Sequence, residues 1–444
     1  MSLPRYGQYK NSGLPWVGSI PLHWDVYPLK RELTFLTSGS RGWAEHYSDD
    51  GALFIRIGNL TRDSIKLDLS DIQRVEIPSG AEGERTKVQP GDVLFSITAY
   101  LGSVAVVPDC LERAFVSQHV ALARLRAGKV LPSWVAYVAA SELGKTYLET
   151  RGYGGTKVQL SLDDVAGLLL PVPTTAEQSA IVAFLDGETS KIDALIAEQV
   201  KLIALLAEKR QATISRAVTK GLNPSAPMKD SGVAWMREVP AHWDVVPLKY
   251  LVELRSGGTP SKDRLDYWDG DIPWASAKDL KVEKLGGTID RITQQAVEDG
   301  AASLVRAGAV LVVVRGMILA RMFPVVETLV PMTINQDLKA VLPRNGLNAS
   351  FLAWLLRGSA DESLQRLDEA GHGTKALRMD AWTSMQLPIP PLEEQVQLIE
   401  FISRETAKLD ALRTESEQAI GLLNERRRAL IASAVTGQID VRNV

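Results

Sequence analysis

Residues 12–30 read SGLPWVGSIPLHWDVYPLK, and residues 231–249 read SGVAWMREVPAHWDVVPLK. Eleven of these 19 positions are identical, whereas ordinary residue frequencies would give about one match by chance. Weaker matches follow in the same order and at a nearly constant offset, among them Gly155-Thr156-Lys157 with Gly373-Thr374-Lys375 and Glu177-Gln178 with Glu394-Gln395. The chain is therefore a tandem duplication, and we expect two similar halves related by a pseudo-twofold axis.

A long helix is predicted at the end of each half. Proline-rich segments at 171–173 and 387–391 stop the preceding structure, and no proline follows for many residues. About 43 residues at 1.5 Å each would make a helix about 65 Å long. Apolar residues recur at alternating spacings of three and four, which predicts a coiled-coil seam of Leu185, Ile192, Leu195, Leu202, Leu206, Ile402, Leu409, Leu412 and Leu423.

Polar residues interrupt this predicted seam at matching places. Glu188 and Glu405 are equivalent, and Gln199 aligns with Ser416. Two interpretations stay open: the helices diverge there, or the polar residues fix the register of the pair at some cost in stability.

The predicted fold is mixed α+β. Two similar globular domains, residues 1–173 and 223–390, are expected to be separated by two long antiparallel coiled-coil helices within 174–222 and 391–444. Each globular block combines strand-like apolar runs with helical stretches and Gly/Pro turns, an alternation that by itself fits either an α+β or an α/β block. The arrangement is pseudo-cyclic, because the C-terminus is equivalent to the linker between the halves, and the two termini should lie close together.

Composition excludes several classes of protein. The 444 residues are 45% hydrophobic and carry a net charge of −3, without an apolar run long enough for a membrane span or an apolar signal core. A cytoplasmic protein without membrane contact fits these features. The one cysteine, Cys110, excludes an internal disulfide and a cysteine-based zinc site. No segment is a polybasic arm, so contact with nucleic acid would need a patch made by folding.

Catalytic signatures are missing. Residues 139–146 fit the phosphate-loop pattern formally, but they continue a helical run and do not follow a strand. Residues 223–225, Asn-Pro-Ser, lack the rest of an amino-methyltransferase motif, and no nuclease-type acidic cluster stands out. His23 and His242 are repeat equivalents with an expected structural role beside Trp24 and Trp243. No catalytic residue and no metal site are predicted.

Polar loops recur in both halves instead. Each half has an early loop rich in Ser, Thr and Gly, a strand with aromatic and polar residues, a polar strand end and a Gly-Thr-Lys loop. Such side chains can bond base edges and phosphates. The candidate DNA-binding residues are Ser38, Arg41, Arg56, Asn59, Ser117, Gln118, His119, Thr156 and Lys157 in the first half and Ser256, Thr259, Ser261, Lys262, Ser276, Lys278, Asn335, Gln336, Thr374 and Lys375 in the second.

With these features the chain resembles the DNA-specificity (S) subunits of type I restriction-modification systems over essentially its whole length. The resemblance rests on the duplicated segments 16–29 and 235–248, on the helix starts PVPTTAEQ (171–178) and PIPPLEEQ (388–395), and on RQATISRAVTKG (210–221) with its echo at 427–437.

The resemblance implies two target-recognition domains, each reading one half of an asymmetric bipartite site in double-stranded DNA. It implies two modification (methyltransferase) subunits held by the helices, with S-adenosylmethionine on those subunits, and restriction subunits that use ATP and Mg. This chain itself would carry no cofactor. The alternative is a protein-interaction scaffold of two duplicated domains on a coiled coil, without a role on DNA.

Overall fold

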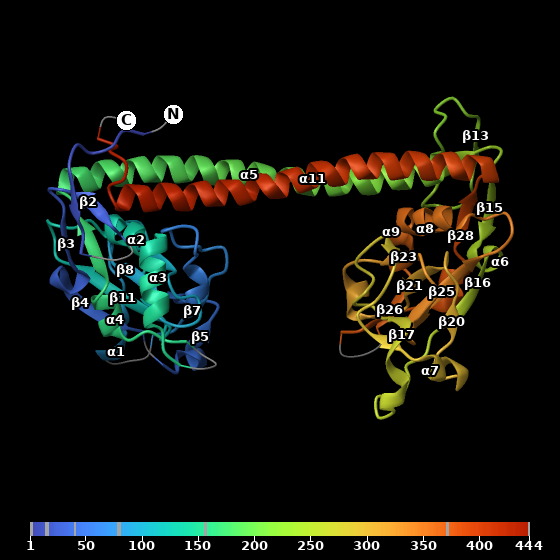
Figure 1. The fold of residues 1–444 in the computed structure, drawn as a ribbon, viewed down its shortest axis with the longest axis horizontal. Helices are drawn as coiled ribbons and strands as arrows, with labels where there is room; N and C mark the ends of the chain where they lie inside the picture. Colours follow the sequence, from blue (N-terminus) through green and yellow to red (C-terminus); the bar gives the residue numbers. More distant parts are fainter. Residues whose placement is uncertain are drawn as a thin grey trace. The chain divides into compact units, whose positions relative to one another are not determined.

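The structure, a computed structural model, describes residues 3–13, 17–39, 41–77, 81–154, 158–369 and 373–442. Contacts group the chain into two units, residues 1–200 with 417–444 and residues 201–416. Each unit contains a globular part and a section of both long helices, α5 (Thr175–Lys220) and α11 (Leu392–Val435) (Figure 1). The finer domain division expected at residues 173, 222 and 390 stays a prediction.

The globular part of the first unit is built on a sheet of order β4-β11-β8-β9. Other strand pairs are β1-β2, β3-β12 and a small sheet of order β10-β6-β7-β5. Its elements are β1 (Tyr9–Asn11), β2 (Ser19–Pro21), β3 (Asp25–Pro28), β4 (Leu33–Ser38), β5 (Tyr47–Ser48), β6 (Ala52–Ile55), β7 (Arg74–Val75), α1 (Ala81–Thr86), β8 (Val93–Ser96), β9 (Val104–Val106), β10 (Ala114–Val116), β11 (Val120–Leu125), α2 (Pro132–Ala140), α3 (Glu142–Arg151), α4 (Leu162–Ala166) and β12 (Leu169–Val172).

The sheet is covered on both faces, which explains the nearly continuous apolar run of its central strands. Alternate residues of β8 point to opposite sides: Val93 and Phe95 join the core around α2, and Leu94 joins the core beneath β6 and β10. All three side chains are fully buried. The layers are thus a helical layer, the main sheet and the small sheet.

The second unit repeats this plan. Its main sheet has the order β16-β25-β21-β23-β18, and the parallel pair β17-β24 corresponds to the parallel pair β6-β10. Its elements are β13 (Met228–Asp230), β14 (Glu238–Pro240), β15 (Asp244–Pro247), α6 (Leu248–Leu251), β16 (Val252–Ser256), β17 (Trp268–Ala275), β18 (Lys284–Leu285), β19 (Arg291–Ile292), α7 (Gln294–Glu298), β20 (Leu304–Val305), β21 (Val310–Val313), β22 (Arg315–Gly316), β23 (Val325–Thr328), β24 (Met332–Ile334), β25 (Leu338–Pro343), α8 (Ala349–Gly358), α9 (Ala360–Leu364), β26 (Leu367–Glu369), β27 (Lys375–Leu377), α10 (Met379–Thr383) and β28 (Gln386–Ile389).

The long helices run antiparallel, as predicted. In the first unit, Ile181 and Leu185 of α5 share a core with Ile431 and Val435 near the end of α11. In the second unit the end of α5 packs against the beginning of α11. There Ile214 and Val218 share a core with Leu398 and Ile402. Residue numbers that rise along one helix therefore fall along the other.

The predicted seam is right for most positions and wrong for three. Leu185, Ile192, Leu206, Ile402 and Leu409 are buried, and Leu423 is half-buried. Leu195, Leu202 and Leu412, however, are 51%, 41% and 47% exposed. The residues next to the first two, Ile196 and Ile203, are half-buried. Residues three and four positions after a seam residue lie on either side of the line that the seam follows along the helix. Which of the two is buried therefore depends on where the partner helix packs.

The polar seam residues form local ion pairs at matching places. Glu188 accepts from Lys191 at 2.7 Å, and its equivalent Glu405 accepts from Lys408 at 2.9 Å. Ser416, the residue that aligns with half-buried Gln199, is buried. These observations do not decide between the two interpretations, and both stay open.

The two ends of the chain meet in the first unit, as the pseudo-cyclic order predicts (Figure 1). The backbone N–H of Asp440 donates to Pro4 O at 2.8 Å, and the Tyr9 hydroxyl donates to Gly437 O at 3.0 Å. Among the described residues, no helix is both long enough and apolar enough to cross a bilayer.

Candidate nucleic-acid interface

Two glycines bring the early loop of each half against the polar strand end of the same half. A Cβ atom on Gly39 would collide with the carbonyl oxygens of Val116 and Ser117, and one on Gly257 would collide with those of Ile334 and Asn335. Only glycine allows this approach of two backbones. In both units the structure thus brings together the early loop and the polar strand end, which are two of the four kinds of polar segment that the sequence indicated.

In the first unit this junction borders two hollows. One cavity of about 430 Å³ is lined by Ser38, Arg41, Gln118 and His119 together with two residues that no sequence pattern singled out, Tyr153 and Gln159. The other, of about 230 Å³, is lined by Trp43, Tyr47, Phe54 and Arg56 and also by Ser117, Gln118 and His119. The strand end that follows β10 is therefore a wall shared by both hollows.

Donors and acceptors of this wall lie close together. Gln118 Nε2 and His119 Nε2 are 3.0 Å apart. The Ser117 hydroxyl is buried and has no hydrogen-bond partner in the described part of the chain. Arg41 is exposed, whereas Arg56 is half-buried and pairs with Asp71 at 3.1 Å. Such a set can meet the mixed donor and acceptor pattern of base edges in the major groove.

Aromatic rings support the smaller hollow. Trp43 stacks on Phe54 with ring centroids 5.6 Å apart, and both rings are buried. Tyr47 packs against Phe54 at 5.9 Å and is exposed. Tyr153, which is 57% exposed, lies beside the larger hollow. Its position in a glycine-rich stretch, residues 152–155, was the one sequence signal that could have indicated it.

Asn59 has a structural role, contrary to its prediction as a DNA-binding residue. Its side chain is buried, accepts from Arg56 N at 2.9 Å, and donates to Asp68 O and Asp71 O at 2.8 and 2.9 Å. Both donors of its amide and one acceptor site of its oxygen are used to close the loop after β6. Thr156 and Lys157 lie outside the described residues.

In the second unit a side-chain bond closes the same junction. The Thr259 hydroxyl donates to Gln336 Oε1, so the early loop is tied directly to the polar strand end. Lys339 on β25 donates to the Ser256 hydroxyl. Lys339 was not singled out by sequence, because nothing local links it to a loop so distant along the chain. Ser261 and Lys262 are exposed beyond this junction.

Two further candidates of the second half are structural. Ser276 bonds Asp279 through its backbone N–H at 2.9 Å and its hydroxyl at 3.0 Å, which closes a turn. Asn335 is buried and accepts from Asp337 N at 3.2 Å. Serine and asparagine satisfy nearby backbone groups in this way as readily as they bind a ligand, so these bonds give both residues a local role, and their contact with DNA stays a prediction.

The lysines of the second half are held by carboxylates. Lys278 donates to Asp290 at 2.6 Å, and this hydrogen bond raises the pKa of Lys278. Lys375 donates to Glu369 at 2.7 Å, which lowers the pKa of that carboxyl. Thr374, next to Lys375, is half-buried. Both exposed pairs would have to open or reorient before either lysine could neutralise a phosphate.

The histidines predicted to be structural bond the starts of the long helices. His23 Nε2 lies 2.8 Å from Glu177, and His242 Nε2 lies 2.8 Å from Glu394. Burial alone would raise the pKa of Glu177, but hydrogen bonds from His23 and Thr174 outweigh it and lower the pKa. Across the described residues, no three His, Cys, Asp or Glu side chains are grouped so that they could hold a metal ion.

Comparisons with known proteins find similarity to specificity subunits. Residues 240–421 match the type I restriction modification DNA specificity domain. The chain is 30% identical over 149 residues to the type I restriction enzyme EcoR124I/EcoR124II specificity subunit of Escherichia coli, an alignment covering 33% of this chain and 37% of that relative. The StySPI specificity subunit of Salmonella potsdam is 20% identical over 96% of this chain and 91% of its own length.

Solved structures show the same fold. A chain described under "complex assembly and conformational transition of the type I R-M system" superposes with a TM-score of 0.73 and 19% identity, covering 94% of this chain and 99% of its own. The HsdS subunit of Thermoanaerobacter tengcongensis gives a TM-score of 0.52 with 17% identity over 94% of this chain and 98% of its own. The likeness therefore extends to both halves and both long helices.

Proposed function

We propose that this chain, which belongs to the specificity-subunit family of type I restriction-modification systems, selects the DNA sequence on which a multisubunit enzyme acts and performs no chemistry itself. The observation that carries the proposal is the glycine junction at Gly39 and Gly257, which occurs once in each unit. Each unit thereby presents one surface on which an early loop and a polar strand end meet. Two such surfaces suit a DNA site with two separate halves.

The two surfaces differ in chemistry although their frames correspond. The first offers Arg41, Gln118 and His119 with aromatic rings beside them, and the second offers Thr259, Gln336 and Lys262. Because base pairs are distinguished by donor and acceptor pattern, different side chains on equivalent frames would read different bases. We therefore propose that the bipartite site is asymmetric, with one half read by each unit.

The partners follow from the same proposal. Two modification subunits, each with S-adenosylmethionine, would methylate adenine N6 in the selected site, and restriction subunits would supply ATP- and Mg-dependent activity. The net charge of −3 supports a role for these partners in binding DNA, because phosphate contacts from this chain alone would be few. The large exposed apolar residues of the long helices, such as Val200 and Leu205, suit protein contacts.

The long helices would set the spacer between the two half-sites. Both α5 and α11 pass through the boundary of the two units without a break. A continuous helix advances about 1.5 Å per residue, so the number of residues in the pair is a fixed length built into the chain. We propose that this length determines how many non-specific base pairs the complex accepts.

A methylation map tests the function. The chain is co-expressed with its modification subunit in cells that lack other adenine methylation, and methylated adenines are located by sequencing. The expected result is one asymmetric bipartite motif with a constant spacer, lost when this chain is omitted. Methylation without sequence preference, or preference that persists without this chain, would favour the scaffold alternative.

A further inference from the structure

Arg210 and Arg427 occupy equivalent positions in the two copies of the repeat, and each makes the same contact across the long helices. Arg210 Nε donates to Asp410 at 3.1 Å in the second unit. Arg427 donates through Nη2 to Asp193 in the first unit. Asp193 and Asp410 are repeat equivalents at the same offset as the two arginines, so one interhelical ion pair has been kept in both copies of the duplicated chain.

Each arginine also reaches the globular part of its own unit at equivalent places. Arg427 Nη1 donates to the backbone oxygen of Asp63 at 3.2 Å, and Arg210 Nη2 donates to the Glu283 carboxylate. Each acceptor comes just before a short segment that pairs in parallel with a strand of the main sheet. Asp63 precedes Lys66, which bridges to Val106 of β9, and Glu283 precedes β18, which pairs with β23. Each arginine therefore extends from one long helix and bonds both the other long helix and the edge of the globular part.

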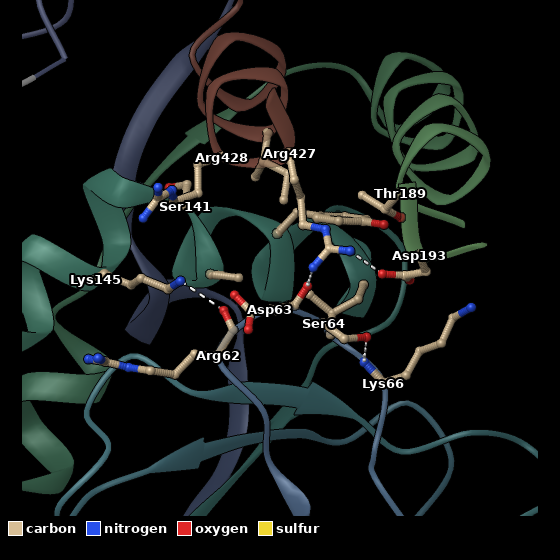
Figure 2. A pocket seen from close by; sticks show the side chains of 14 residues that line it. Arg62, Asp63, Ser64, Lys66, Ser141, Lys145, Thr189, Asp193, Arg427 and Arg428 are labelled. Carbon is tan, nitrogen blue, oxygen red and sulfur yellow. Dashed lines mark hydrogen bonds and ion pairs between the residues drawn. The ribbon is translucent and has the colours of Figure 1, made fainter. Parts of the chain in front are cut away.

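The surroundings of Arg427 show a joint that is polar and enclosed. Figure 2 shows Arg427 reaching down from α11, with Asp193 of α5 on one side and Asp63 on the other. Its side chain is only 6% exposed. Lys145 on α3 donates to Arg62 O at 2.8 Å in the same cavity, and burial lowers the pKa of this lysine.

A polar joint does something that apolar packing does not. Apolar attraction is non-directional, so it holds a domain at one angle only as far as the side chains interlock. A guanidinium has a planar fork of donors with fixed directions, and its hydrogen bonds weaken steeply when they are bent. An arginine that extends from one helix and bonds two further elements therefore fixes an angle as well as a contact.

We propose that Arg427 and Arg210 are positioning residues that lock each globular part at one angle on the helix pair and thereby restrict the spacer lengths that the complex accepts. The proposal rests on the proposed function, since it assigns the accuracy of the spacer to two named side chains. A spacer that is one base pair too long also turns the second half-site by roughly a tenth of a helical turn. A globular part held at one angle cannot turn to meet the rotated half-site, whereas a globular part with a loosened joint can.

The test compares Arg427→Met and Arg210→Met with Arg426→Met in the complex with the modification subunits. Arg426 is the matched control, because it is exposed and its ion pair, with Glu188 at 3.5 Å, involves only the long helices. The rate of methylation is measured on DNA carrying the two wild-type half-sites with spacers of every length. We expect each joint variant to raise the rate at neighbouring spacers, relative to the best spacer, by at least about fivefold, the lower end of usual coupling between sites. The control should leave the profile unchanged.

The shape of the profile separates positioning from mere stabilisation. A residue that only stabilises the fold would lower the rate at every spacer by the same factor, and that outcome overturns the proposal. If Arg427→Met does not assemble, the milder Asp193→Asn and Asp410→Asn variants decide, because they remove only the charge of a half-exposed partner. If both aspartate variants keep the wild-type dependence of the methylation rate on spacer length, the proposal is likewise overturned. If the wild-type complex shows no bipartite preference, the proposed function itself fails, before any variant is compared.

Discussion

Gln178 and Leu131 are joined by a hydrogen bond that fastens the start of α5 to the loop before α2: Leu131 N donates to Gln178 Oε1 at 2.9 Å. The amide of Gln178 also donates to Lys129 O at 2.9 Å and Pro173 O at 3.0 Å. The second unit repeats this bond by bond at Gln395, whose partners at the equivalent positions are Asn348 N, Gly346 O and Pro390 O at 2.8, 3.0 and 2.9 Å.

Replacing either glutamine should therefore destabilise its own unit. Both side chains are fully buried, and removing one leaves three backbone groups without partners. Gln178→Ala and Gln395→Ala should each lower the free energy of unfolding by at least about 3 kcal/mol, because each of the three unsatisfied buried groups costs about 1–3 kcal/mol. Urea unfolding measures the loss. The exposed residue Gln397 of α11 is the control, and Gln397→Ala should change stability by less than about 0.5 kcal/mol.

The lowered pKa of Glu177 predicts a dependence of stability on pH. A carboxyl whose pKa is lower in the folded state than in the unfolded state stabilises the fold above its unfolded pKa, about 4.3 for glutamate. That contribution is lost as pH falls through the lower folded value. The destabilisation caused by Glu177→Gln should hence be largest near pH 7 and shrink towards pH 3. Urea unfolding of both proteins across this range gives the measurement, and an equal difference at all pH values would contradict it.

Two leucines on the same helix should respond differently to truncation. Leu206 is buried, whereas Leu202 is 41% exposed. Leu206→Ala should cost about 2–4 kcal/mol, as buried leucines usually do, and Leu202→Ala should cost less than about 1 kcal/mol. Thermal unfolding of the two variants tests this corrected seam. Equal losses would mean that Leu202 and not Ile203 faces the partner helix.

Base selection should divide between the units. Gln118→Ala should relax the preference at one position of one half-site by about 1–3 kcal/mol, the usual discrimination of a bidentate contact, and leave the other half-site unchanged. Gln336→Ala should affect the other half-site only. Methylation of randomised half-site libraries reads both effects. Asn59→Ala serves as a structural contrast, because it should reduce stability without changing the selected bases.

Lengthening both helices should lengthen the spacer. Four residues inserted after Val200 and after Glu417, which are repeat equivalents, add about 6 Å per helix, close to two base pairs of duplex at about 3.4 Å each. A coiled coil can absorb such an insertion as a stutter. A methylation assay on a spacer library should show the same half-sites with a longer spacer. An unchanged spacer in a soluble, active complex would contradict the role of the helices.

The duplication, the mixture of helices and strands and the long helices can all be predicted from the sequence. Repeated motifs such as Glu177-Gln178 and Glu394-Gln395 are visible along the chain, and a proline-free run with a regular apolar period has few other ways to fold. Close termini followed from the same repeat, because the end of a duplicated chain is equivalent to the junction in its middle.

Which polar residues form a surface cannot be predicted from the sequence and depends on the folded chain. Asn59, Ser276 and Asn335 belong to residue types that bind DNA, yet their hydrogen bonds are used by nearby backbone or side-chain groups. Lys339 and Tyr153 reach the candidate surfaces from segments that no local pattern connects to them. The sequence also left open which residues of the long helices are buried, since residues three and four positions after a seam residue are both close to the seam. In each case the partner is distant in sequence, and a side chain's role depends on which groups folding brings within hydrogen-bonding or packing distance of it.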